Sequence, residues 1–199
     1  MSKTYLFFIA LLLFFVGCSD KIEEKKYEKE KKIILIEDNL SKIDSFILYN
    51  IQNEPQKVTI SNNKVIFHTP QQGILLINLF ASWCKPCMDN IEYINILQEK
   101  YSKDIFIVGV NVNDELNSTQ IEELQKKHKI KYFLSTSPSN NDFANLLVKT
   151  LKLPKNHDIP LVAIFVEGRY FAYYEGRVPI EMIEYDIKEA IGEVELPNG

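Results

Sequence analysis

Residues 77–87 read INLFASWCKPC, a largely apolar run that ends in two cysteines separated by two residues, Cys84 and Cys87. The longer stretch 73–81 is almost continuously apolar, which is typical of a strand covered on both faces. In residues 86–101 apolar side chains recur at helical spacing. The sequence therefore predicts a strand–turn–helix unit with both cysteines at the junction.

A cysteine at the start of a helix is well placed for thiol chemistry. The free N–H groups and the positive end of the helix dipole stabilise a thiolate at Cys84, and a lowered thiol pKa makes a nucleophile available near neutral pH. Cys87 lies one turn further on and can close a disulfide with Cys84. Pro86 fits the first helical turn because its missing N–H costs nothing there, and Lys85 adds a cation beside the sulfurs. A bare pair of this spacing also occurs as half of a zinc site or as two unrelated thiols.

The rest of the chain alternates strand-like and helix-like segments. Strands are expected over 45–50, 57–68 with a break at Asn62-Asn63, 73–81, 104–112, 131–134, 161–167 and 170–175, and helices over 86–101, 118–128, 142–151 and 180–191. Ser118 is the expected N-cap of its helix, and Gly168-Arg169 the expected tight hairpin turn. This order predicts an α/β fold with a mixed central sheet and helices on both faces.

Composition excludes several classes of protein. The chain has 199 residues, 46% of them hydrophobic and 25% charged, which fits one ordinary globular domain and neither a disordered nor a multi-span membrane protein. A net charge of −4 argues against nucleic-acid binding. Three cysteines are too few for a disulfide scaffold or a four-cysteine zinc site. His68, His128 and His157 have no metal-ligand spacing, so we expect no metal site. Chemistry at a cysteine pair implies no organic cofactor either.

The N-terminus has the pattern of an export signal. Lys3 precedes the apolar run 5–16, which as a helix would span about 18 Å, short of the roughly 30 Å hydrocarbon core of a bilayer. The ending Phe15-Val16-Gly17-Cys18 resembles a bacterial lipoprotein box, although Phe15 stands where leucine is usual. A plain cleaved signal or a short uncleaved anchor, with Cys18 incidental, is the alternative. If Cys18 carries lipid, Cys84 and Cys87 remain as an isolated pair in a compartment where disulfides persist.

Three regions follow from this pattern. We predict a lipoprotein signal peptide over 1–17, a lipidated N-terminus and charged tether over 18–44, and a folded domain over 45–199. Residues 20–32 carry six lysines and five acidic residues without an apolar stripe, which is typical of a solvated linker.

The stretch 77–87 resembles the active site of the thioredoxin fold. Within that fold, residues 45–191 are similar to the membrane-tethered, exported thiol–disulfide reductases of the TlpA/ResA-like family. The resemblance rests on the lipoprotein start, an N-terminal β-hairpin, the strand–WCxPC–helix motif that begins at Trp83, and a helical insertion after the second core strand. It implies that residues 45–199 form a thioredoxin-like domain.

The resemblance also assigns roles in the site. Pro160, preceded by Ile159, is implied to be a cis-proline that faces the cysteines and helps dock extended substrate. On its own, Pro160 would read as an ordinary trans proline at the start of a strand. Trp83, Lys85 and Pro86 are implied to support the reactive pair.

Other positions depart from familiar patterns. Asn78 stands where cytoplasmic thioredoxins keep a buried aspartate that assists proton transfer, and the exported family often has asparagine there. Asn90 replaces a glutamate common in the family, so the proton relay is open, with Asp89 or Glu92 as possible substitutes. Leu161 stands where threonine often follows the cis-proline.

The expected function is that of a lipid-anchored thiol–disulfide oxidoreductase, facing the periplasm or another extracytoplasmic space. Cys84 would act as the nucleophile and Cys87 as the resolving cysteine. The resemblance implies disulfide-bearing exported proteins such as apocytochrome c as substrates, and a membrane electron donor of the CcdA/DsbD type. Two alternatives stay open: an oxidase or isomerase of the same fold, and a non-catalytic binding module or chaperone. Lys85-Pro86, which lacks the histidine of strong oxidants, favours the reductase.

Overall fold

The computed structural model describes three stretches of the chain, residues 43–61, 64–69 and 73–193. The predicted signal peptide, the lipidation site Cys18, nearly all of the tether and the Asn62-Asn63 turn lie outside the described residues. No helix within the described part is both long enough and apolar enough to cross a membrane.

One mixed sheet organises the described residues. Its strands, in chain order, are β1 (Asp44–Tyr49), β2 (Pro55–Ser61), β3 (Lys64–Phe67), β4 (Ile74–Phe80), β5 (Ile105–Asn111), β6 (Phe133–Ser135), β7 (Leu161–Val166) and β8 (Arg169–Glu175). They lie in the order β1-β2-β3-β8-β7-β4-β5-β6. The β4–β5 and β5–β6 pairs are parallel and the other pairs are antiparallel. The mixed sheet expected from the order of segments is confirmed.

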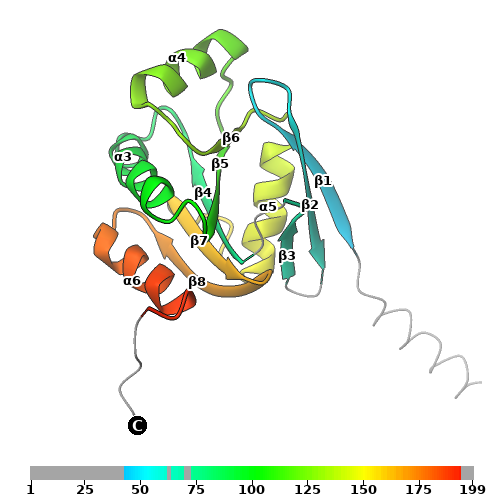
Figure 1. The fold of residues 1–199 in the computed structure, drawn as a ribbon. Coiled ribbons are helices and arrows are strands. Elements are labelled where there is room, and N and C mark those ends of the chain that lie inside the picture. The colour runs from blue at the N-terminus through cyan, green and yellow to red at the C-terminus, as the bar shows by residue number, and fades with distance from the viewer. Residues whose placement is uncertain (1–42, 62–63, 70–72, 194–199) are drawn as a thin grey trace, which may run out of the picture. The chain divides into compact units, whose positions relative to one another are not determined.

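Helices cover both faces of this sheet. They are α3 (Lys85–Lys100), α4 (Ser118–His128), α5 (Asn140–Thr150) and α6 (Ile180–Ala190). Figure 1 shows α3 and α6 on one side of the sheet and α5 on the other. Ile91 and Ile94 of α3 share a buried cluster with Ile183 of α6, whereas Phe143 and Leu147 of α5 belong to a second cluster. The two clusters are the two halves of the core.

Strand β4 contributes to both halves, because successive side chains of a strand point to opposite faces. Leu76 and Phe80 pack on the side of α3 and α6, whereas Leu75 and Ile77 pack on the side of α5. All seven residues of β4 are buried. This explains its continuous apolar sequence, which Asn78 alone interrupts.

The expected helical insertion follows β5, as α4 and then the short β6. Helix α4 spans the predicted residues, but its N-cap is Asn117 and not Ser118. The Asn117 side chain accepts the Gln120 N–H at 3.0 Å, and the Gln120 side chain accepts the Asn117 N–H at 2.9 Å. This reciprocal capping box satisfies two N–H groups at once, which a cap at Ser118 would not do.

The β7–β8 turn also differs from the prediction by one residue. It is formed by Glu167 and Gly168, with φ values of 51° and 77°, and Arg169 already belongs to β8. Two positive φ values are the signature of the type I′ turn, whose twist matches that of the flanking strands. Glycine at the second position makes this turn favourable.

Several element ends shift by one or two residues. Helix α3 starts at Lys85 and α5 at Asn140, each earlier than predicted, and β1 starts at Asp44. Strand β6 starts later, at Phe133, because the Lys131 N–H is bonded to the Asn95 side chain of α3 at 3.0 Å and not to a neighbouring strand.

The sheet topology brings three segments to one edge. Strands β4 and β5 run parallel, so their carboxyl ends, Phe80 and Asn111, lie side by side. Strand β7 runs antiparallel to β4, and its first residue Leu161 pairs with Leu79. Residues just before β7 therefore meet the segments that follow β4 and β5.

Candidate active site

Cys84 and Cys87 lie at this edge, where β4 passes into α3. They form a disulfide, with their Cα atoms 5.2 Å apart. Cys84 is 6% exposed and Cys87 is fully buried beneath it. The first cysteine is therefore the one that another molecule can reach.

Cys84 is the N-cap residue of α3. Its Sγ atom accepts the backbone N–H of Cys87 at 3.1 Å, and its carbonyl oxygen accepts the N–H of Met88 at 3.1 Å. The Cys84 N–H is itself donated to the Ala81 carbonyl at 3.1 Å. A thiolate formed at Cys84 in this position would be stabilised by the Cys87 N–H and by the N-terminus of α3.

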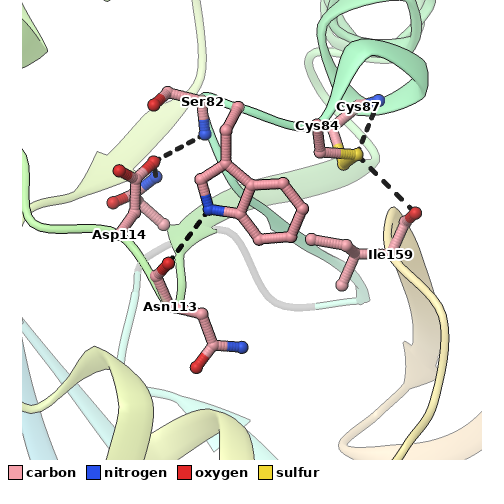
Figure 2. Close-up of a disulfide and its surroundings, with 8 residues drawn as sticks. Ser82, Cys84, Cys87, Asn113, Asp114 and Ile159 are labelled. Carbon is pink, nitrogen blue, oxygen red and sulfur yellow. Dashed lines mark hydrogen bonds between the residues drawn. A yellow bond between two sulfur atoms is a disulfide. The ribbon is translucent and has the colours of Figure 1, made fainter.

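The segment before β7 lies against the disulfide. The Ile159–Pro160 peptide bond is cis, the state that the family resemblance implied. The carbonyl oxygen of Ile159 lies 3.7 Å from Cys84 Sγ, as Figure 2 shows. The structure thus brings Ile159 and Pro160 to the disulfide, and their role in docking substrate stays a prediction.

The residues around the pair occupy different environments. Trp83 is 66% exposed, and its indole N–H donates to the Asn113 carbonyl at 3.0 Å. Pro86 lies in the first turn of α3, as predicted. The ammonium of Lys85 lies 3.1 Å from a carboxylate oxygen of Asp89, one helical turn on. Because the Asp89 carboxylate partly neutralises the Lys85 ammonium, the positive potential at the sulfurs is lower than an unpaired lysine would produce.

A second set of contacts, absent from the sequence prediction, joins the last residue of β5 and the residues that follow it to the turn before α3. The Ser82 N–H donates to an Asp114 carboxylate oxygen at 2.6 Å, and the Asn111 side-chain amide donates to the same oxygen at 3.0 Å. Figure 2 shows Asp114 and Asn113 facing this turn. We call residues 111–114 the clamp loop. The signal available in the sequence was the segment Asn-Val-Asn-Asp, three of whose four residues are polar, at the end of a buried strand.

Asp114 gives the clamp loop a negative charge at neutral pH. Partial burial acts to raise the pKa of Asp114, but the hydrogen bonds from Asn111 and Ser82 outweigh burial and hold the pKa below its ordinary value. Asp114 is therefore a carboxylate at neutral pH. Asn113, with φ of 52°, takes a left-handed conformation, and its N–H donates to the Asn141 side chain at 2.9 Å.

Asn78 lies in the core on the side of α3. It is fully buried, and neither of its side-chain polar atoms forms a hydrogen bond of ordinary geometry within the described residues. The hydroxyl of Tyr132 is in the same situation. Burial raises the pKa of Tyr132 well above its ordinary value, and the nearby Asn78 side chain opposes part of this rise. Two buried polar groups thus lie together in an otherwise apolar layer.

The three residues considered for the proton relay lie in the first turns of α3. Asn90 is partly buried and Glu92 is exposed, whereas Asp89 is engaged by Lys85. The structure thus offers no free buried carboxylate at these three positions. Leu161 is fully buried, as the first residue of β7.

The histidines lie in separate places. His68 pairs with Thr59 through a 3.3 Å contact on the hairpin side, and burial lowers the pKa of His128 at the end of α4. The Nδ1 atom of His157 is buried without a hydrogen-bond partner in the described residues. Within the described stretches, no three side chains of the metal-binding types gather into a cluster.

Comparison with known proteins adds a family and a fold. A family model described as Redoxin matches residues 41–175, well over half of the chain. A search of curated proteins finds no match.

Three solved structures illustrate the likeness in fold. StoA from Bacillus subtilis is 21% identical with a TM-score of 0.50, covering 72% of this chain and 96% of that one. A putative thiol:disulfide interchange protein DsbE from Chlorobium tepidum is 18% identical with a TM-score of 0.53, covering 75% and 94%. The exposed lipoprotein thioredoxin Etrx1 from Streptococcus pneumoniae is 16% identical with a TM-score of 0.52, covering 73% and 99%.

The structural likeness, at low sequence identity, shows a shared thioredoxin-like fold, and the family match covers the strand, the turn and the helix that carry both cysteines. The chain belongs to the Redoxin family, and with its Cys84–Cys87 pair it is a thiol–disulfide oxidoreductase of the thioredoxin-like fold.

Proposed function

We propose that this protein is an exported, lipid-anchored thiol–disulfide reductase that reduces disulfide bonds in other exported proteins. One observation carries the proposal. Cys84 caps α3 with its sulfur against the Cys87 N–H and is the more accessible member of the pair, at 6% exposed, while Cys87 is fully buried one turn further in. This is the arrangement that an attacking and a resolving cysteine require.

The reaction has two steps. The Cys84 thiolate attacks one sulfur of a substrate disulfide, the substrate S–S bond breaks, and the departing sulfur takes up a proton. The Cys87 thiol then loses its proton and attacks Cys84 in the mixed disulfide. The substrate leaves as a dithiol, having gained two electrons and two protons, and the pair is left as the disulfide of the structure.

Electrostatics at the pair supports the reductase direction. A cation beside Cys84 stabilises the thiolate, hence the reduced form, and raises the reduction potential toward that of an oxidant. Asp89 lies 3.1 Å from the Lys85 ammonium and offsets this effect. The fixed negative charge of Asp114, bonded to Ser82 two residues before Cys84, acts in the same direction as Asp89.

Export and anchoring rest on the sequence of residues 5–18. The apolar run and the terminal Gly17-Cys18 support a diacylglyceryl group on Cys18 after cleavage. Mass spectrometry of the N-terminus of the mature protein tests this. We expect a lipidated Cys18, and an unmodified peptide that begins elsewhere would refute the anchor while leaving the chemistry at Cys84 intact.

The proposed partners follow from the family resemblance. Disulfide-bearing exported polypeptides, with apocytochrome c as the leading case, would be the substrates. A membrane protein of the CcdA/DsbD type would return electrons to the Cys84–Cys87 disulfide.

Trapping of reaction intermediates tests the proposed chemistry. Cys87→Ser removes the resolving thiol, so this variant should accumulate mixed disulfides with substrate proteins through Cys84. Cys84→Ser is the matched control and should trap none. Equal trapping by both variants, or stronger trapping by Cys84→Ser, would refute the assignment. A double Cys→Ser variant with full biological activity would instead point to a binding module or chaperone.

A further inference from the structure

The clamp loop makes two direct contacts with the segment that leads into the reactive cysteine. Asp114 accepts the Ser82 N–H at 2.6 Å, and the Asn113 carbonyl accepts the Trp83 indole N–H at 3.0 Å. Ser82 and Trp83 are the two residues directly before Cys84. The clamp loop therefore binds the turn at two successive positions, through the main chain of Ser82 and the side chain of Trp83.

The clamp loop is itself fixed from behind. The Asn113 N–H is donated to the Asn141 side chain at 2.9 Å, and the Asn140 side-chain amide donates to the Asn111 carbonyl at 3.0 Å. Asn140 is buried and also bonds Ser135 at the end of β6. Because these hydrogen bonds to the start of α5 fix the backbone of the clamp loop, the clamp loop can in turn fix the position of the turn before α3.

Position matters at Cys84 more than at most residues. Its sulfur accepts the Cys87 N–H at 3.1 Å only while Cys84 keeps the extended conformation of an N-cap, with φ of −85° and ψ of 101°. The effect of a helix N-terminus on a charge fades within the first turn. A small displacement of residues 82–84 would therefore remove stabilisation from a thiolate that forms there.

We propose that Asp114 is a positioning residue of the active site, whose hydrogen bond to the Ser82 N–H holds Cys84 at the N-terminus of α3 and so keeps its thiol reactive. The Asp114 carboxylate accepts hydrogen bonds from Ser82 and Asn111, so it acts on Cys84 through the backbone of the turn. The inference rests on thiol–disulfide exchange at Cys84–Cys87 and is independent of its direction.

Asp114 exerts two effects that oppose one another, and substitutions can separate them. Its negative charge disfavours a nearby thiolate, whereas its hydrogen bond positions the thiolate favourably. Asp114→Asn removes the charge and keeps an oxygen for the Ser82 N–H. Asp114→Ala removes both. The difference between these two variants therefore isolates the hydrogen bond. Glu115→Gln is the matched control, since it removes one exposed carboxylate from the adjacent position.

The test is the pH profile of Cys84 alkylation in the reduced full-length chain, with iodoacetamide as the probe. Tandem mass spectrometry of the peptide that contains Cys84 separates its signal from that of Cys18. We expect Asp114→Ala to react about tenfold more slowly at neutral pH than Asp114→Asn, with its profile displaced to higher pH. Asp114→Asn and Glu115→Gln should stay within about threefold of the wild type. Equal rates for Asp114→Ala and Asp114→Asn would overturn the proposal.

Trp83 is the single tryptophan of the chain, and its fluorescence in the folded protein reports the local environment of the turn and not global stability. We expect its emission in the oxidised protein to shift in Asp114→Ala and to stay unchanged in Glu115→Gln. If Asp114→Ala fails to fold, Asp114→Glu replaces it, since it keeps the charge but displaces the carboxylate. Asp114→Glu should then react more slowly than the wild type, which carries the same charge, and an equal or faster rate would overturn the proposal. Failure of the wild-type disulfide to be reduced by dithiothreitol would instead count against the function itself.

Discussion

Substitution of Gly109 by alanine should destabilise the domain through one identifiable clash. Gly109 lies in the middle of β5 and pairs with Asn78 of β4. A Cβ atom at Gly109 would lie 2.7 Å from Cε2 of Tyr132, and 3.4 Å from side-chain atoms of both Leu134 and Phe80. Tyr132 is only 5% exposed, so its ring has no open space to enter.

The magnitude follows from this overlap. Overpacking a well-packed core costs about 1–3 kcal/mol, and the closest approach here is to a buried ring rather than to a flexible chain end. We therefore expect Gly109→Ala to lower the free energy of unfolding by about 2 kcal/mol, or to lower Tm by roughly 4–8 °C for a domain of this size. Urea unfolding of the oxidised protein, followed by circular dichroism, measures the change.

A double-mutant cycle identifies the cause. Tyr132→Leu removes the atom that the new methyl group would meet. The combined variant Gly109→Ala/Tyr132→Leu should therefore lose less stability than the two single changes added together, by about 1 kcal/mol. Strict additivity, or a Gly109→Ala variant as stable as the wild type, would refute this description of the packing between β5 and Tyr132.

Two further predictions concern charge. Asp89→Asn should free the Lys85 ammonium to stabilise the Cys84 thiolate and so raise the reduction potential of the disulfide. An exposed ion pair contributes about 0.5–1 kcal/mol, which corresponds to a rise of roughly 10–20 mV. A lower reduction potential in a dithiothreitol-buffered titration would contradict this prediction. The pKa of Glu184 is lowered to about 2, first by its hydrogen bond with Lys100, so Glu184 adds stability above its unfolded pKa near 4.5 that is lost as pH falls toward 2. The wild type should exceed Glu184→Gln by about 1 kcal/mol in urea unfolding at pH 7, after allowance for solvent screening, and by much less at pH 2; a pH-independent difference would exclude the ion pair as its source.

The sequence predicted the sheet and the reactive pair because both depend on short-range patterns. The continuous apolar run of β4 marks a strand buried on two faces, and the Cys84–Cys87 spacing marks one helical turn. The N-cap of α4 was misplaced by one residue because Asn117 and Ser118 are both good caps, and only the reciprocal bond to Gln120 decides between them.

The clamp loop could not be predicted in the same way. Asp114 receives its hydrogen bond from Ser82, which lies 32 residues earlier in the chain, and the donor is a backbone N–H that any residue type provides. The place of the Tyr132 ring likewise depends on Gly109, because a Cβ atom at that position would lie 2.7 Å from the ring. Sequence patterns locate a site of this kind, but tertiary packing determines what positions it.

The reduction potential of the Cys84–Cys87 disulfide tests the central proposal most directly. Trp83 adjoins Cys84 and is the single tryptophan, so its fluorescence should report the redox state of the pair in dithiothreitol or glutathione buffers. The reductase proposal predicts a midpoint near the thioredoxin value of about −270 mV, with the pair held reduced in vivo. A midpoint above about −180 mV, together with a pair that is oxidised at steady state in vivo, would contradict it and identify a disulfide-forming oxidant.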